Sequence, residues 1–200
     1  MCEDACFLCR MCDNMERAGD HKGEAKRRAP LRRKGGRSMD LPQRKQLRLP
    51  DYDYSAPGAY FVTICTRDRR CILSDVTVGA AISRPPEVRL TRYGEIVDLA
   101  IRNIPSVYPS VSVDHYVIMP NHIHLILQIH CVEDGRMISA PTISTVVGQM
   151  KRWISRQAGT ALWQKSYHEH VIRNENDYRD IWEYIENNPI RWAEDRYYES

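Results

Sequence analysis

The stretch Met119–Leu127 constrains the fold of this chain most, because it carries the alternating pattern of a half-buried strand. Side chains along a strand point to opposite faces in turn, so His122 and His124 share one face and Ile123 and Leu125 share the other. The apolar face is suited to packing on a core. The other face presents two imidazoles about 7 Å apart along the backbone, near enough for neutral rings to share one divalent cation.

Hydrophobic periodicity elsewhere predicts a mixed chain of strands and helices. Strands are expected over residues 60–66, 111–119 and 122–130, with a short extended segment over 167–173 and a loop or hairpin over 74–87. Helices are expected over residues 92–103, 142–157 and 177–187, with Pro105 ending the first of them. This order lacks repeated strand–helix units, so it favours an α+β fold with an antiparallel sheet over a doubly wound fold.

The last predicted helix carries a second pair of polar residues. Tyr184 and Asn188 are four residues apart, so they project from one face of the helix, while Ile181 and Ile185 suit the core. Opposite a His-x-His strand, the amide oxygen is placed to complete a metal shell, and the phenol to attack phosphorus. The alternative for His122 and His124 is a pair of half-buried strand histidines whose hydrogen bonds are satisfied within the fold.

The net charge of +3 is unevenly distributed along the chain. Residues 1–50 contain 13 Lys and Arg against 7 Asp and Glu, whereas residues 51–200 contain 16 against 19. We therefore expect a basic, disordered N-terminal arm over 1–50, a folded domain over 51–193 and a C-terminal tail over 194–200. The commonest use of such an arm is contact with nucleic acid through its phosphates.

The seven cysteines of the chain cannot all pair within it, because their number is odd. Cys2, Cys6, Cys9 and Cys12 have a spacing that suits zinc or an iron–sulfur cluster, although a flexible leader without a metal is the interpretation we favour. No run approaches the roughly 18 apolar residues of a membrane span, and no secretory signal is evident. A reducing, cytoplasmic setting without membrane contact is the expectation.

In these motifs the chain resembles the single-tyrosine HUH transposases, and within them the REP-associated tyrosine transposases. His122-Ile123-His124 matches the HUH element, in which U is a hydrophobic residue, and Tyr184 lies in the matching Tyr-Ile-x-x-Asn-Pro sequence. Supporting similarity lies in residues 60–66, 117–121, 163–164 and 168–173. The resemblance covers about residues 47–193 and leaves the arm without a counterpart.

The resemblance implies a ferredoxin-like antiparallel sheet with helices packed on one face and the HUH element on a central strand. It implies an enzyme that cleaves and rejoins single-stranded DNA at hairpins or palindromic repeats through a 5′-phosphotyrosine. By position, Tyr184 is the nucleophile, and His122, His124 and Asn188 hold Mg²⁺ or Mn²⁺. It leaves open whether such an enzyme acts as a monomer or as a homodimer.

Two other functions stay open for the same residues. One is a hairpin-binding module that has lost cleavage, and the other is a His-x-His metal phosphodiesterase without covalent chemistry. Two groups of basic residues are candidates for contact with DNA phosphates, although solvated charges are an equally good interpretation. They are Arg67, Arg69 and Arg70 in the turn after the first strand, and Lys151, Arg152 and Arg156 on the second long helix.

Overall fold

The computed structural model describes residues 53–77, 86–131 and 141–194. All of them belong to the unit Pro50–Ser200, one of two units into which the chain divides. The predicted arm over 1–50, with Cys2, Cys6, Cys9 and Cys12, lies outside the described residues, as does all of the predicted tail except Glu194. Those predictions stay predictions.

Four antiparallel strands form the main sheet: β1 (Gly58–Cys65), β4 (Val111–Ile118), β5 (His122–Ile129) and β6 (His168–Ile172). Their order across the sheet is β4-β5-β1-β6. This is the strand order of the ferredoxin-like fold, so the predicted α+β class is confirmed. Strand β5 lies inside the sheet between β4 and β1, as expected for the strand that carries the two histidines.

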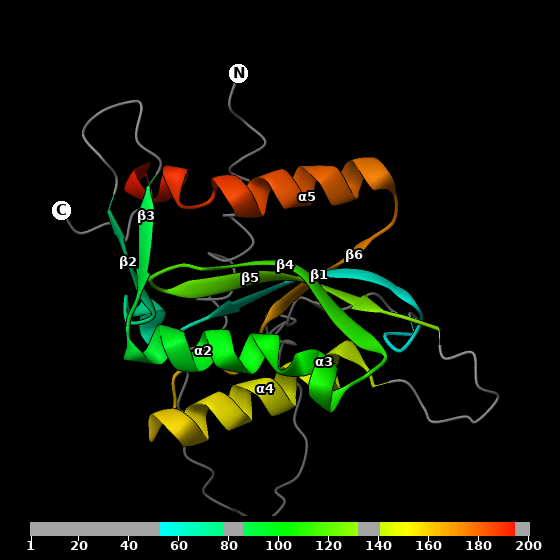
Figure 1. Ribbon diagram of the computed structural model, residues 1–200, viewed down its shortest axis with the longest axis horizontal. Coiled ribbons are helices and arrows are strands. Elements are labelled where there is room, and N and C mark those ends of the chain that lie inside the picture. Colours follow the sequence, from blue (N-terminus) through cyan, green and yellow to red (C-terminus); the bar gives the residue numbers. More distant parts are fainter. Residues whose placement is uncertain (1–52, 78–85, 132–140, 195–200) are drawn as a thin grey trace, which may run out of the picture. The chain divides into compact units, whose positions relative to one another are not determined.

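Helices cover both faces of this sheet (Figure 1). On one face lie α2 (Arg92–Arg102), the short α3 (Ile104–Val107) and α4 (Ile143–Ala158). On the opposite face lies α5 (Glu175–Asn187), which contacts β4 and β5. The expected packing of helices on one face therefore describes α2 and α4, and α5 adds a separate layer over the other face.

Alternation along β1 and β5 builds the hydrophobic core on the side of α2 and α4. In β1 it buries Tyr60, Val62 and Ile64, and their partners in β5 are Leu127, Leu125 and Ile123. Each of these side chains is fully buried, and full burial of an aliphatic or aromatic side chain stabilises the fold by about 1.5–3 kcal/mol. The same strands thus have their other faces free to carry polar groups.

Local signals set the ends of the helices. The side chains of Thr91, Thr142 and Asn174 accept hydrogen bonds from backbone N–H groups in the first turns of α2, α4 and α5, as N-caps do. Gly159 ends α4 with φ of +69°, a left-handed conformation that glycine adopts without a steric penalty.

Pro105 does not end its helix as predicted. Helix α2 ends at Arg102, and Pro105 lies in the first turn of α3. A proline is favourable there because the first N–H groups of a helix have no partner within the helix.

The segment predicted as a loop or hairpin is a hairpin. Strand β2 (Ser74–Thr77) pairs with β3 (Glu87–Leu90) in a separate two-stranded sheet, and residues 78–85 lie outside the described part. Among the described residues, no helix is both long enough and apolar enough to cross a membrane.

Candidate active site

His122 and His124 lie side by side on the face of β5 that α5 covers. Their ring centroids are 4.5 Å apart, and the two residues are 7% and 2% exposed. Across the sheet they pair with Cys65 and Thr63 of β1. The predicted alternation is confirmed, because the intervening Ile123 belongs to the core on the other face.

Each imidazole has its Nδ1 atom occupied by a buried side chain. The His122 Nδ1 lies 2.6 Å from the amide oxygen of Asn121, which only accepts, so this nitrogen carries the hydrogen. The His124 Nδ1 lies 2.8 Å from the Thr63 hydroxyl. Partners at Nδ1 fix the orientation of each ring, and they leave Nε2 as the nitrogen that would bind a metal.

Tyr184 and Asn188 project from α5 towards this pair. The Tyr184 hydroxyl lies 3.5 Å from the His124 Nε2, and the Asn188 side chain hydrogen-bonds to His122. Phe61 of β1 supports the group, since its ring stacks on His124 and meets the Tyr184 ring edge-on at 6.1 Å. The four residues predicted to form the site are therefore brought together.

Three contacts along α5 hold the helix over the sheet. Asp177 in its first turn lies 2.9 Å from the Nε2 of His170 on β6. One residue later the Tyr178 hydroxyl donates to Asp114, and Trp182 stacks on His115 with the ring centroids 4.1 Å apart. The helix is thus anchored to both edge strands, β6 and β4, and this fixes the direction in which Tyr184 projects.

Burial keeps both imidazoles neutral. It lowers the pKa of His122 to about 3, and the Arg69 guanidinium adds to this effect, while the hydrogen bond with Asn188 opposes it. The pKa of His124 is also lowered well below 6.5, first by burial and then by His122, Arg69 and His168. Neutral imidazole is the form that binds metals, so the protonation state suits a metal site.

The donor set fits a divalent cation that keeps open positions. The two imidazoles lie beside each other with the Asn188 side chain next to His122, and within the described residues no group of three or more His, Cys, Asp or Glu is placed to share a metal. An ion held by so few protein ligands takes the rest of its shell from water and phosphate oxygens. This is the coordination expected where a nucleic acid is the substrate.

The two groups of candidate basic residues differ in where they lie. Arg67 and Arg70 are exposed, whereas Arg69 is buried and its charge contributes to the lowered pKa of both histidines. The α4 residues Arg152 and Arg156 are exposed on the opposite side of the sheet.

Lys151 of the same helix has a structural environment. Its ammonium donates to the carbonyl oxygens of Gln164, Lys165 and Ser166, and burial lowers its pKa to about 8. The α4 residues are therefore not gathered with the histidines.

Reasoning from sequence missed Asn121, Thr63 and Phe61. Asn121 carries a signal, since it directly precedes His122 at the turn before β5. Thr63 and Phe61 have no signal of their own, because only the register of β1 against β5 brings them to the site.

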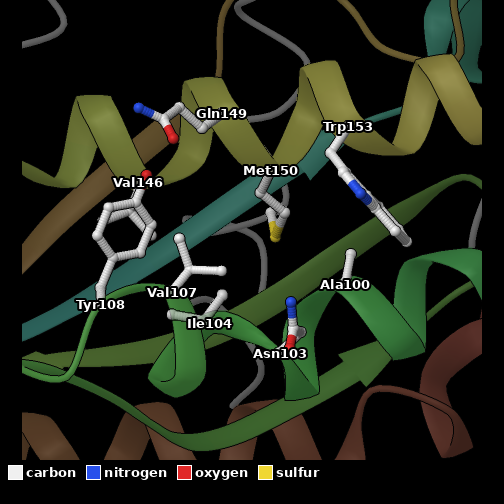
Figure 2. A pocket seen from close by; sticks show the side chains of 9 residues that line it. All are labelled: Ala100, Asn103, Ile104, Val107, Tyr108, Val146, Gln149, Met150 and Trp153. Carbon is white, nitrogen blue, oxygen red and sulfur yellow. The ribbon is translucent and has the colours of Figure 1, made fainter.

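An apolar groove lies on the other face of the sheet, between α2, α3 and α4. Figure 2 shows Val107 and Tyr108 facing Met150 and Trp153 across a cavity of about 120 Å³. Its lining contains no histidine and no charged side chain, and the sheet separates it from the histidine site.

Comparison with known proteins connects this site to a family. An uncharacterized protein of Haemophilus influenzae is 33% identical over 177 residues, which cover 79% of this chain and 94% of that protein. A second protein of the same organism, provisionally named a REP-associated tyrosine transposase, is 26% identical over 147 residues, covering 70% of this chain and 74% of its own length.

A solved structure of a REP-associated tyrosine transposase bound to a REP hairpin is 25% identical, with a TM-score of 0.50, and covers 72% of this chain and 74% of that one. The chain is similar to REP-associated tyrosine transposases in sequence and in fold. No family model matches the chain. This similarity supports a transposase-like function, and the fold found here resembles that of the solved transposase structure.

Proposed function

We propose that this protein cleaves and rejoins single-stranded DNA, with Tyr184 as nucleophile beside a Mg²⁺ or Mn²⁺ ion held by His122, His124 and Asn188. One observation carries the proposal: the Tyr184 hydroxyl lies 3.5 Å from the His124 Nε2, in a site where burial lowers the pKa of both imidazoles and so keeps them neutral. The REP hairpin in the related structure supports a DNA hairpin as the substrate.

In the proposed reaction the phosphate is transferred from the 3′-oxygen of DNA to Tyr184. The Tyr184 oxygen attacks phosphorus, its proton passes to water, and a new phosphotyrosine ester forms. The bond from phosphorus to the 3′-oxygen breaks, and that oxygen takes up a proton and leaves as a 3′-hydroxyl. Attack by another 3′-hydroxyl reverses these steps, so the ester conserves the energy needed for joining.

A phenol has a pKa of about 10, so the site must favour attack by a weak nucleophile at neutral pH. The divalent ion would supply Lewis-acid stabilisation of the charge that develops on the phosphate. The contacts of α5 with both edge strands keep Tyr184 directed at the same point, and positioning of this kind lowers the barrier further.

Incubation with a labelled hairpin oligonucleotide, followed by denaturing electrophoresis, tests the proposal. We expect a protein–DNA adduct with Mn²⁺ or Mg²⁺, no adduct with EDTA, and no adduct for Tyr184→Phe. Tyr93→Phe is the matched control, because Tyr93 lies on α2, on the opposite face of the sheet from the histidines.

Two other outcomes would select other functions. Hairpin binding without any cleavage by the wild type would indicate a binding module. Cleavage that survives Tyr184→Phe would indicate a metal phosphodiesterase that uses water.

A further inference from the structure

The apolar groove between α2, α3 and α4 is open to solvent at its rim. Val107 and Trp153, which line it, are 55% and 39% exposed, and they are two of the four large hydrophobic side chains that are exposed in the described part of the chain. Figure 2 shows Tyr108 and Trp153 at opposite ends of the groove, with Met150 between them. Apolar side chains that stay exposed around a cavity are typical of a binding site.

One buried polar group of the groove has unused hydrogen-bonding capacity. The Tyr108 hydroxyl oxygen is buried, and it has no hydrogen-bond partner among the described residues. A buried hydroxyl without a partner is unfavourable, and a ligand with a matching polar atom removes that cost. The side-chain amides of Asn103 and Gln149 belong to the same lining, and each can both donate and accept. The groove therefore suits a ligand with an apolar face and polar atoms at its edge.

Positive charge borders the groove. Neither its lining nor helices α3 and α4 contain an acidic residue, and Asp98 of α2 is paired with Arg102. Arg152 is exposed next to Trp153 on α4, and its charge offsets part of the rise in the pKa of Tyr108 that burial causes. The expected ligand thus carries negative charge beside its apolar face.

An unpaired nucleotide combines these properties. Its base has a face that stacks on aromatic rings and an edge of donors and acceptors, and its phosphate is negative. An apolar cavity of about 150 Å³ admits a benzene ring, so a groove of about 120 Å³ that is open on one side has room for one base. A second copy fits less well, because a two-fold contact through this face would bring Arg152 of both copies together.

We propose that this groove binds an unpaired base of the DNA hairpin between Trp153 and Tyr108, with the Tyr108 hydroxyl bonded to the edge of the base and Arg152 at the neighbouring phosphate. The inference rests on the proposed function and deepens it, because it names a second contact with the same substrate. The sheet separates the groove from the histidines, so this base lies away from the phosphate that Tyr184 attacks. The groove recognises the substrate and takes no part in bond breaking.

Binding without cleavage is measured by fluorescence anisotropy, with the full chain in EDTA and a labelled hairpin oligonucleotide that has an unpaired loop and flanks. We expect Trp153→Leu to weaken binding about tenfold and Tyr108→Phe about fivefold. Leu99→Ala is the matched control, because Leu99 is an exposed apolar residue of α2 that does not line the groove, and this variant should bind as the wild type does.

Abasic substitutions test whether the contact is with a base. Each unpaired nucleotide is replaced in turn, and at one position the change should weaken binding of the wild type about tenfold. It should have little effect on Trp153→Leu, in which the contact is already lost. Independent losses at every position, or wild-type affinity of both groove variants, would overturn the proposal.

Two further measurements assign a contrary result. Wild-type hairpin affinity of the groove variants with weaker self-association in analytical ultracentrifugation would show that a second copy occupies the groove. The same affinity with unchanged self-association would indicate an acidic protein segment instead. Misfolding is checked by urea unfolding of Tyr108→Phe, which should be at least as stable as the wild type because the hydroxyl it loses has no partner in the free protein.

The groove and the proposed chemistry fail separately. An abasic effect that depends on Trp153, without any adduct in Mn²⁺, would reject cleavage and keep the groove as part of a hairpin-binding module. An adduct without such an effect would reject the groove and keep the proposed cleavage.

Discussion

The two faces of the main sheet are built from the same strands and are almost equally buried, yet they have opposite chemistry. In β5, Leu125 is fully buried against the layer of α2 and α4, and its neighbour His124 is 2% exposed beneath α5. Burial of leucine stabilises the fold, whereas burial of an imidazole disfavours its charged form and lowers its pKa. One face thus supplies stability, and the other holds polar groups that are kept neutral and oriented.

This difference shows why the site needs supporting residues that the core does not. Aliphatic side chains are held by packing alone. Each buried imidazole instead needs a partner, which is Asn121 for His122 and Thr63 for His124. The active face is therefore a small hydrogen-bonded network placed on a sheet that the other face stabilises. Substitutions on the histidine face should therefore lower activity, and substitutions on the core face should lower stability.

The largest expected effect follows from His124→Ala. Loss of one ligand and of the contact with Tyr184 should lower the rate of adduct formation by more than about 1000-fold and leave most of the hairpin affinity. Quantified denaturing gels and a fluorescence-anisotropy titration measure the two quantities. Parallel loss of cleavage and hairpin binding would contradict a purely chemical role for this residue.

Leu125, the next residue along β5, should affect stability and not activity. Leu125→Ala should lower the free energy of unfolding by about 2–5 kcal/mol, because it creates a cavity in the core. The fraction that stays folded should retain adduct formation within about threefold of the wild type. Urea unfolding and activity per folded molecule check this prediction. A loss of activity greater than the loss of folded protein would show that the two faces are coupled.

The neutrality of His122 predicts a dependence of stability on pH. An unfolded histidine takes up a proton below about 6.5, but the folded residue resists until about pH 3. Between these values the unfolded state binds more protons. The contribution of His122 to the free energy of unfolding should therefore be fully present above pH 6.5 and fall as the pH drops towards 3. Unfolding curves in EDTA at pH 7, 6, 5 and 4 should show a shallower slope for His122→Gln. Identical slopes would mean that His122 takes up its proton over the same pH range in the folded and unfolded protein.

A smaller effect is expected at the supporting residues. Asn121→Ala should weaken Mn²⁺ binding about 10- to 100-fold, the usual range for a group that orients a metal-binding histidine. Isothermal titration calorimetry measures this change, and Ser112→Ala, on the edge strand β4, is a control that should leave it unaltered. Unchanged affinity in Asn121→Ala would show that the orientation of His122 is set by packing alone.

The smallest effect concerns the arm predicted over residues 1–50. Removal of residues 1–45 should weaken hairpin binding and reduce its dependence on salt, because it removes phosphate-neutralising charge but no ligand. The slope of log affinity against log salt concentration is the measurement. An unchanged slope would show that the arm does not contact DNA.

Patterns within one element were predictable from the sequence, and relations between elements were not. Alternation placed His122 and His124 on one face, and helical spacing placed Tyr184 and Asn188 together. The partnership of Thr63 with His124 depends on the register of two strands distant in the chain. A sequence pattern contains no information on that register.

The basic residues illustrate the same limit. Arg67, Arg69 and Arg70 look equivalent in the sequence, and only the left-handed turn makes Arg69 the buried one. Lys151 looks like a surface charge on a helix until the loop 164–166 closes over its ammonium group. In both cases the environment of the cation is set by backbone geometry that the sequence pattern does not show.

Identification of the amino acid that is linked to DNA tests the central claim most directly. The chain contains 11 tyrosines, so an adduct alone does not identify the nucleophile. Trypsin should release the peptide Asp180–Arg191, in which Tyr184 is the sole tyrosine. We predict that mass spectrometry of the nuclease-trimmed adduct finds the nucleotide phosphate on this peptide. A nucleotide on any other peptide, Tyr178's included, would contradict the account.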